Sequence, residues 1–163
     1  MPDLLTHVLF GISLGLVLVG DGDRKRILLV TVGSILSDID RPIGWLFEFF
    51  GVRIIGLTES FHSLLGAVLL TFAASCLFID SELDRVEIFK LLFIGEISHI
   101  LLDMTMFPWA EMGIFLLYPL RIPFSFHLFW SDYWYYPLFG FAALGVALAI
   151  HLVRTRYLRI MKS

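Results

Sequence analysis

Five long apolar stretches dominate this chain, and they constrain its fold more than any other feature. They cover residues 4–20, 27–39, 61–79, 86–107 and 137–153. Most of them approach the roughly 20 residues that an α-helix needs to cross the hydrocarbon core of a bilayer. The second is shorter and ends in carboxylates. We therefore predict an all-α fold, namely a multi-pass membrane helix bundle with about five transmembrane helices.

The composition is that of an integral membrane protein. Of the 163 residues, 58% are hydrophobic and 17% are charged, which is far more apolar than an average soluble domain. We expect residues 1–163 to form a single integral membrane domain in the cell membrane. The formal net charge of -3 does not favour a basic face, so nucleic acid is not an expected partner.

Basic residues are distributed unevenly between the two ends of these stretches. If the N-terminus lies outside, the outer segments hold only Arg41, Arg53 and Arg121. The other nine of the 12 Lys and Arg residues fall in inner segments: Arg24, Lys25, Arg26, Arg85, Lys90, Arg154, Arg156, Arg159 and Lys162. Because basic residues accumulate on the cytoplasmic side of membrane proteins, the sequence favours an N-out, C-in orientation.

In this orientation, six ionisable side chains fall near the outer ends of four stretches. They are His7, Asp38, Asp40, His62, His99 and Asp103. The orientation was chosen from the basic residues alone. That all six side chains then fall near the same face is therefore independent support for a shared site. An ionisable group within a membrane span is costly unless it pairs, meets water or binds an ion. The sequence therefore predicts a shared metal cluster near the outer face.

His99 and Asp103 form the most specific pair in this set. They are four residues apart, so on a helix they share one face about one turn, or roughly 5.4 Å, apart. Glu96 lies three residues before His99 and is expected either to fix the imidazole tautomer or to be a further ligand. The simpler interpretation of the pair is a structural hydrogen bond. An unpaired aspartate at this depth costs about 2.5–3.5 kcal/mol, which favours the metal.

Asp38 and Asp40 flank Ile39 shortly before Pro42, where we expect the helix to end. An extended backbone would point both carboxylates to one side, whereas a helical backbone would leave only one of them at the metal. The two residues are equally compatible with a polar turn that simply ends a helix. Both remain candidate ligands.

The ligand types indicate which metal fits. Three imidazoles and three carboxylates suit zinc, with manganese or iron as alternatives, and do not suit an all-oxygen calcium cage. The chain has a single cysteine, Cys76, so a thiolate metal site would lack partner ligands. Six ligands exceed what one catalytic zinc ion uses, so the site is expected to hold one or two ions. Two ions would activate water and neutralise charge on a phosphoryl oxygen.

Several short motifs follow one another in a definite order. They are Thr6-His7 followed by Gly11, Ser37-Asp38-Ile39-Asp40, Phe61-His62-Ser63, Gly95 with Ser98-His99-Ile100-Leu101-Leu102-Asp103, and Gly113 leading to Leu117-Tyr118-Pro119. In order and spacing, this set resembles the LexA-regulated, membrane-bound predicted metal-dependent hydrolase family. That family commonly has a proline where Ser37 stands, and an arginine-glycine element near Thr58-Glu59-Ser60. The resemblance implies a metal-dependent hydrolase.

The ligand order His, Asp, His, then His-x-x-x-Asp is also similar to that of the zinc-dependent phospholipase C and single-strand nuclease superfamily, which cleaves phosphate esters. That resemblance implies a first zinc ion held by His62, His99, Asp103 and either Asp38 or Asp40. It implies a second ion held by His7, with Asp103 as the bridge. The later residues that supply a third zinc ion in the superfamily have no match here, so a third ion is not expected.

Together these observations predict a membrane-embedded, phospholipase-like metal-dependent hydrolase. Its expected substrate is a phosphate ester of a membrane lipid or a lipid-linked molecule near the outer face. Asp38, Asp40 or Glu96 would handle the proton as the catalytic residue. The alternative is a metal-ion or proton transporter that uses the same His/Asp cluster, although the inner half of the chain offers few polar groups for transit. A closed, structural metal site is the third interpretation.

Overall fold

Helices account for nearly all of the regular structure. The computed structural model describes residues 3–19, 23–54, 56–78, 82–107, 114–126, 128–130 and 135–161. Within these residues the elements are α1 (Leu4–Val19), α2 (Arg24–Gly33), the 3-10 helix η1 (Ser37–Ile39), α3 (Asp40–Phe49), α4 (Leu57–Phe61), α5 (Leu64–Leu77), α6 (Arg85–Met104), β1 (Met106–Phe107), β2 (Phe129–Trp130) and α7 (Tyr136–Ile160). The predicted all-α class is confirmed.

Two of the predicted stretches do not form one continuous helix each. The stretch 27–39 is not one helix, because α2 ends at Gly33 and a turn leads into η1. Pro42 does not end a helix as expected; it lies in the first turn of α3, where backbone N–H groups need no partner within the helix. The stretch 61–79 begins with Phe61, the last residue of α4, and α5 starts only at Leu64; its last residue, Ile79, lies outside the described residues.

Polar side chains fix where three of the helices begin. Asp23 accepts a hydrogen bond from the Arg26 backbone N–H at 3.2 Å at the start of α2. Ser63 accepts from Gly66 N–H at 3.0 Å at the start of α5, and Asp84 caps α6 in the same way. Each cap satisfies a backbone donor that has no partner within its helix. The Arg26 N–H also holds the pKa of Asp23 below its ordinary value.

Two glycines let α2 and α6 approach each other backbone to backbone. A Cβ atom added to Gly33 would overlap the carbonyl oxygen of Leu92, and one added to Gly95 would overlap the carbonyl oxygen of Val30. Any larger side chain at either position would push the helices apart. This contact lies one helical turn from His99, so it sets the distance of that imidazole from α2.

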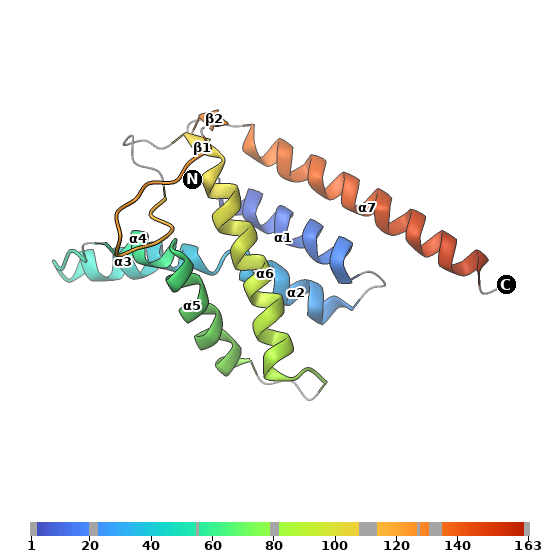
Figure 1. Cartoon of the computed structure of the whole chain (residues 1–163), viewed down its shortest axis with the longest axis horizontal. Helices are drawn as coiled ribbons and strands as arrows, with labels where there is room; N and C mark the ends of the chain where they lie inside the picture. Colours follow the sequence, from blue (N-terminus) through green and yellow to red (C-terminus); the bar gives the residue numbers. More distant parts are fainter. Residues whose placement is uncertain are drawn as a thin grey trace.

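The helices form a bundle built around α6 and α1 (Figure 1). Helix α2 packs against both of them, α5 packs on α6, and α7 packs along α1. One core cluster joins α2, α5 and α6, and comprises Leu29, Ala74, Leu83, Ile88 and Leu92. A second joins α5 to the far end of α6 and comprises Ala67, Ile100 and Met104. The ligand candidates of α6 therefore lie beside the second core.

The connection between α6 and α7 folds back onto the end of α6. Strands β1 and β2 pair in parallel. The Phe126 backbone N–H donates to the Met104 carbonyl at 2.7 Å, and the Leu64 N–H donates to the Leu116 carbonyl at 2.9 Å. The connection thus covers the end of the bundle at which α6 finishes and α5 starts. Gly113, part of the family-like motif, lies outside the described residues.

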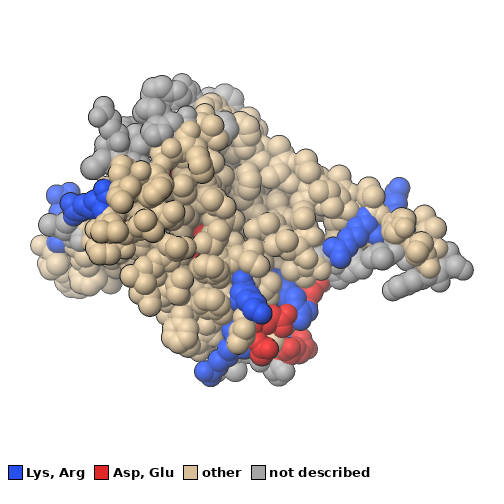
Figure 2. Space-filling model, viewed as in Figure 1, with Lys and Arg blue, Asp and Glu red and all other residues tan. Residues whose placement is uncertain are grey.

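Apolar side chains cover much of the outer surface. Leu77 is 83% exposed and Val153 69% exposed, and Figure 2 shows that uncharged surface dominates one face of the molecule. By length and composition, Tyr136–Tyr157 is the one helical segment among the described residues that is clearly able to cross a membrane, while Leu4–Val19 and Leu64–Leu77 are apolar but shorter. The number of membrane spans stays a prediction.

Candidate metal centre

Five of the six predicted ligands lie in one buried cluster, which we call the metal cluster. They are His7 in α1, Asp38 in η1, His62 between α4 and α5, and His99 and Asp103 in α6. None of the five is more than 8% exposed. Two overlapping groups can each surround an ion, because one ligand atom from every member lies within 4.8 Å of the others: His7, His99 and Asp103, and Asp38, His62 and His99.

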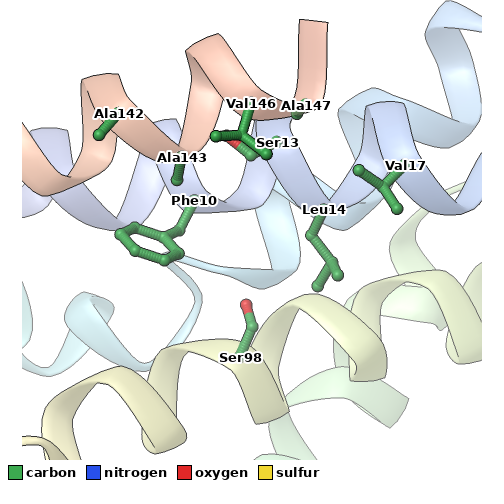
Figure 3. A pocket seen from close by; sticks show the side chains of 9 residues that line it. All are labelled: Phe10, Ser13, Leu14, Val17, Ser98, Ala142, Ala143, Val146 and Ala147. Atoms are coloured by element: carbon green, nitrogen blue, oxygen red, sulfur yellow. The ribbon is translucent and has the colours of Figure 1, made fainter. Parts of the chain in front are cut away.

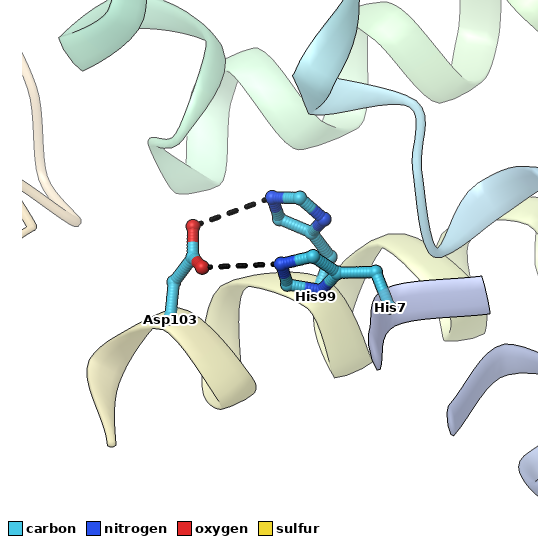
Figure 4. A group of neighbouring side chains, drawn as sticks. All are labelled: His7, His99 and Asp103. Atoms are coloured by element: carbon cyan, nitrogen blue, oxygen red, sulfur yellow. Dashed lines mark ion pairs between the residues drawn. The ribbon is translucent and has the colours of Figure 1, made fainter. Parts of the chain in front are cut away.

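Asp103 faces the neighbouring imidazoles of His7 and His99 and points one oxygen at each ring (Figure 4). Its Oδ1 is 3.3 Å from His7 Nε2, and its Oδ2 is 3.3 Å from His99 Nε2. His62 Nε2 approaches the same Oδ2 at 3.5 Å. The rings of His7 and His99 stack with centroids 3.9 Å apart. A carboxylate whose two oxygens face different imidazoles is suited to bridge two ions.

These separations match the spacing of ligands around one metal ion better than they match hydrogen bonds. Two ligands of a tetrahedral zinc ion, each at about 2.0–2.1 Å, lie about 3.4 Å apart. The three imidazole–carboxylate distances fall between 3.3 and 3.5 Å, whereas N–H···O hydrogen bonds fall at about 2.7–3.2 Å. Donor atoms of the types that zinc prefers are thus spaced as its coordination would require.

Backbone carbonyls orient two of the imidazoles. His99 Nδ1 lies 2.9 Å from the Ser34 carbonyl oxygen, and His62 Nδ1 lies 3.0 Å from the Thr58 carbonyl oxygen. A carbonyl can only accept, so both Nδ1 atoms carry the proton. In a neutral imidazole, Nε2 then carries the lone pair, and both Nε2 atoms face Asp103. This is the usual arrangement of metal-binding histidines.

The buried oxygens of the cluster lack ordinary partners. Both carboxylate oxygens of Asp38 and both of Asp103 are buried and accept no hydrogen bond, and neither His62 Nε2 nor His99 Nε2 makes one. Arg41 Nε approaches Asp38 Oδ1 at 3.4 Å, but two buried carboxylates need more positive charge than one half-exposed guanidinium supplies. The residues present therefore fit a bound divalent ion.

The structure distinguishes Asp38 from Asp40. The backbone across both residues is helical, since Asp38 lies in η1 and Asp40 begins α3. The two carboxylates diverge as the helical alternative predicts: Asp38 belongs to a ligand group with His62 and His99, whereas Asp40 Oδ2 is 4.0 Å from His62 Nδ1, behind the ring. Asp40 is 3% exposed and lies next to the cluster without joining either ligand group.

Glu96 is fully buried but has a different neighbour from the one expected. One of its oxygens contacts the Ser37 hydroxyl, and its Oε2 accepts no hydrogen bond. The acceptor that fixes the His99 ring is the Ser34 carbonyl and not Glu96. Glu96 also belongs to neither ligand group. It remains a candidate for moving a proton rather than for holding the ion.

Sequence reasoning missed three residues that support the cluster. Ser34 and Thr58 act through their carbonyl oxygens, which no side-chain pattern can indicate. Arg41 was interpreted only as a topology marker, yet its Nε lies 3.4 Å from Asp38 Oδ1. Its spacing of three residues from Asp38 was the available signal, because residues three apart meet on a helical face.

The fold and the cluster together define a class: an all-helical protein with a buried His/Asp cluster that fits a divalent metal ion. The family model of the YdjM inner membrane protein matches residues 1–161. The chain therefore belongs to the YdjM inner membrane protein family, which supports a location in the membrane. Comparison with curated proteins and with solved structures found no match.

Proposed function

We propose that this protein is a multi-pass inner membrane metallohydrolase that cleaves a phosphate ester of a lipid or lipid-linked molecule near the outer membrane face. The observation that carries the proposal is the set of buried Asp38 and Asp103 oxygens that accept no hydrogen bond, beside three imidazole nitrogens at metal-ligand spacing. A bound divalent ion would acidify water and stabilise charge that develops on a phosphoryl oxygen. One or two ions, with zinc as the first choice, suit this set of ligands.

Five membrane segments in an N-out, C-in orientation would suit this role, although α2, with 10 residues, rises only about 15 Å and its outer end must be buried in protein or hydrated. Helix α6 has 20 residues, or about 30 Å of rise, which matches the hydrocarbon core. Its polar residues Glu96, His99 and Asp103 are buried inside the bundle and not turned outward. Helix α6 is more polar on average than an ordinary membrane span. It is still compatible with a membrane, because its ionisable groups face the protein interior.

Each part of the cluster has a distinct task in the proposed reaction. Asp103 would bridge ions at two positions, since its Oδ1 faces His7 and its Oδ2 faces His62 and His99. Asp38 would complete the second position. Glu96, with one oxygen that accepts no hydrogen bond, is the side chain we assign to receive the proton lost by the attacking water.

Purified protein in detergent provides the direct test. We expect hydrolysis of a phosphate ester such as phosphatidic acid, loss of that activity on treatment with a chelator, and recovery on addition of zinc, manganese or iron. Metal analysis should find the metal in the wild type and much less of it in His99→Ala and Asp103→Ala. If all three proteins carry equally little zinc, manganese or iron, the proposal fails.

The same preparation separates hydrolysis from the other interpretations. Metal-dependent uptake into liposomes without any hydrolysis would assign the cluster to transport. Tight metal binding with neither uptake nor hydrolysis would assign it to structure, because a structural site fills its coordination with protein ligands.

A further inference from the structure

Several apolar clefts lie on the described part of the molecule. Two of them are similar in size but differ in what they adjoin. We call them the Asp38 cleft and the α7 cleft. The Asp38 cleft has a volume of about 510 Å³ and the α7 cleft about 460 Å³. Both volumes are typical of small-molecule sites, which span roughly 300–1,000 Å³. The two clefts are therefore not distinguished by their size but by the residues that line them.

The α7 cleft is lined by small and apolar side chains from α1, α6 and α7 (Figure 3). Phe10 and Leu14 project into it from α1, and Ala143 and Val146 face them from α7. Its polar lining consists of hydroxyls such as Ser98, and none of its described lining residues is charged. Nothing there would hold a charged headgroup.

The Asp38 cleft opens directly at the metal cluster. Asp38 lines the cleft and also belongs to the ligand group with His62 and His99. Arg41 lines the same cleft, with its Nε 3.4 Å from Asp38 Oδ1 and its side chain 40% exposed. The cleft thus joins a cationic group, a candidate metal ligand and an apolar space.

The apolar wall of the Asp38 cleft is formed by residues such as Val32, Ile35 and Trp45. Trp45 belongs to α3, which exposes its apolar side chains: Trp45 is 71% exposed and Phe49 is 83% exposed. A short helix of this kind is suited to the membrane interface, where its apolar face contacts lipid. A lipid chain can therefore reach the cleft from the surrounding bilayer.

We propose that the Asp38 cleft binds an acyl chain of a phosphate-bearing lipid, with the phosphate held by Arg41 beside the metal cluster. This inference rests on the proposed function and names the substrate's binding site. A guanidinium group binds two phosphate oxygens at once, and the arginine charge is matched by the anionic headgroup. Arg41 is then a specificity residue that separates phosphate-bearing lipids from neutral ones.

Lipid binding measured by native mass spectrometry tests the role of Arg41 without requiring turnover. The probes are dipalmitoyl phosphatidic acid and dipalmitoylglycerol, added to the full chain in detergent. We expect Arg41→Gln to weaken binding of phosphatidic acid by about tenfold or more, and to leave binding of dipalmitoylglycerol unchanged. Arg53→Gln is the matched control, because Arg53 does not line the cleft. Equal weakening by both substitutions would overturn the assignment.

A second pair of variants tests the cleft itself. Ile35→Trp fills the Asp38 cleft, and Val146→Trp fills the α7 cleft by a slightly larger increase in side-chain size. We expect the first to reduce phosphatidic acid binding and the second to leave it unchanged. Trp45→Ala removes an exposed part of the wall, so it tests the cleft with little risk to folding. If Val146→Trp weakens binding and Ile35→Trp does not, the cleft assignment is wrong.

Failure of this inference and failure of the proposed function give different results. If phosphate esters are hydrolysed but phosphatidic acid binding is unaffected by Arg41→Gln and Ile35→Trp, the cleft assignment is overturned and the hydrolase proposal stands. If those variants lose binding while no phosphate ester is hydrolysed, the cleft is supported as a lipid site and the hydrolase proposal fails.

Discussion

Charged side chains gather at two regions of this molecule, and the two differ in how their charges are compensated. At one region, where α2 and α6 begin, Lys25 pairs with Glu82 at 2.7 Å, and Arg26 pairs with Glu87 at 2.7 Å. Acidic and basic side chains lie together at the lower edge of the face shown in Figure 2. All four side chains are at least 36% exposed, so water screens them and each pair contributes little.

At the other region, the metal cluster is buried and its compensation is incomplete. The oxygens of Asp38 and Asp103 accept no hydrogen bond, and the histidines that face Asp103 have fully buried or nearly buried side chains. Exposed ion pairs of the first kind are common features of protein surfaces. Buried carboxylates without hydrogen bonds are not, which is why only the second region indicates a function.

The largest expected effect comes from changing Asp103. Asp103→Asn keeps the shape but removes the charge that faces three imidazoles. We expect hydrolysis of phosphatidic acid to fall by at least about 100-fold, more than for loss of a residue that only supports a ligand. Glu82→Gln, at the exposed region, should leave the rate unchanged. Comparable rate losses in both variants would remove the distinction between the two regions.

The packing that assembles the cluster gives the next largest effect. Gly95→Val places side-chain atoms against the carbonyl of Val30, so we expect a loss of stability of about 3 kcal/mol or more. Gly44→Val is the control, because a Cβ at Gly44 meets nothing within 4 Å. Thermal unfolding in detergent measures the difference. Similar melting temperatures for both variants would show that the α2–α6 contact is not critical.

The two glutamates of α6 allow the two regions to be compared within one helix, because Glu96 lies beside the buried cluster and Glu87 lies in the exposed region. Glu96→Gln should reduce hydrolysis by about 10–100-fold while metal content stays unchanged. Glu87→Gln, whose side chain is 36% exposed, should have no effect on either quantity. The assay is the rate on phosphatidic acid beside metal analysis of the same sample. Loss of metal from Glu96→Gln would instead make Glu96 a ligand.

The smallest expected effect is at Asp23, in the exposed region. Hydrogen bonding from Arg26 N–H lowers the pKa of Asp23 in the folded state, so its stabilising contribution is present above the ordinary carboxyl pKa and is lost as the pH falls through the lowered value. We expect Asp23→Ala to have a slightly lower melting temperature than wild type at about pH 6, and the difference to vanish at about pH 2. A difference that is constant with pH would contradict this.

Much of the helical architecture and of the cluster follows from the sequence, because both depend on spacing. The four-residue spacing predicted that His99 and Asp103 share one helix face. The distribution of basic residues predicted that His7, Asp38 and His62 lie near the same end of the bundle as this pair. Four features could not be predicted. The first is the close approach of Gly33, the last residue of α2, to the Leu92 backbone, because the two residues are distant in sequence.

The other three features also depend on tertiary contacts. The choice of Asp38 over Asp40 depends on a helical backbone that the pattern left open. The carbonyl of Ser34 that orients His99 has no side-chain signal at all. The Asp38 cleft is formed by residues of α1, α2, η1 and α3, so it becomes visible only when these elements are placed together.

X-ray absorption at the edge of the metal found in the purified protein tests the central claim most directly. A divalent ion in the cluster should give nitrogen and oxygen scatterers at about 2.0–2.1 Å for zinc, together with the outer-shell scattering of imidazole rings. That imidazole scattering should decrease in His99→Ala. A protein that contains no stoichiometric metal, or a metal whose spectrum shows no imidazole and does not change in His99→Ala, would contradict the claim.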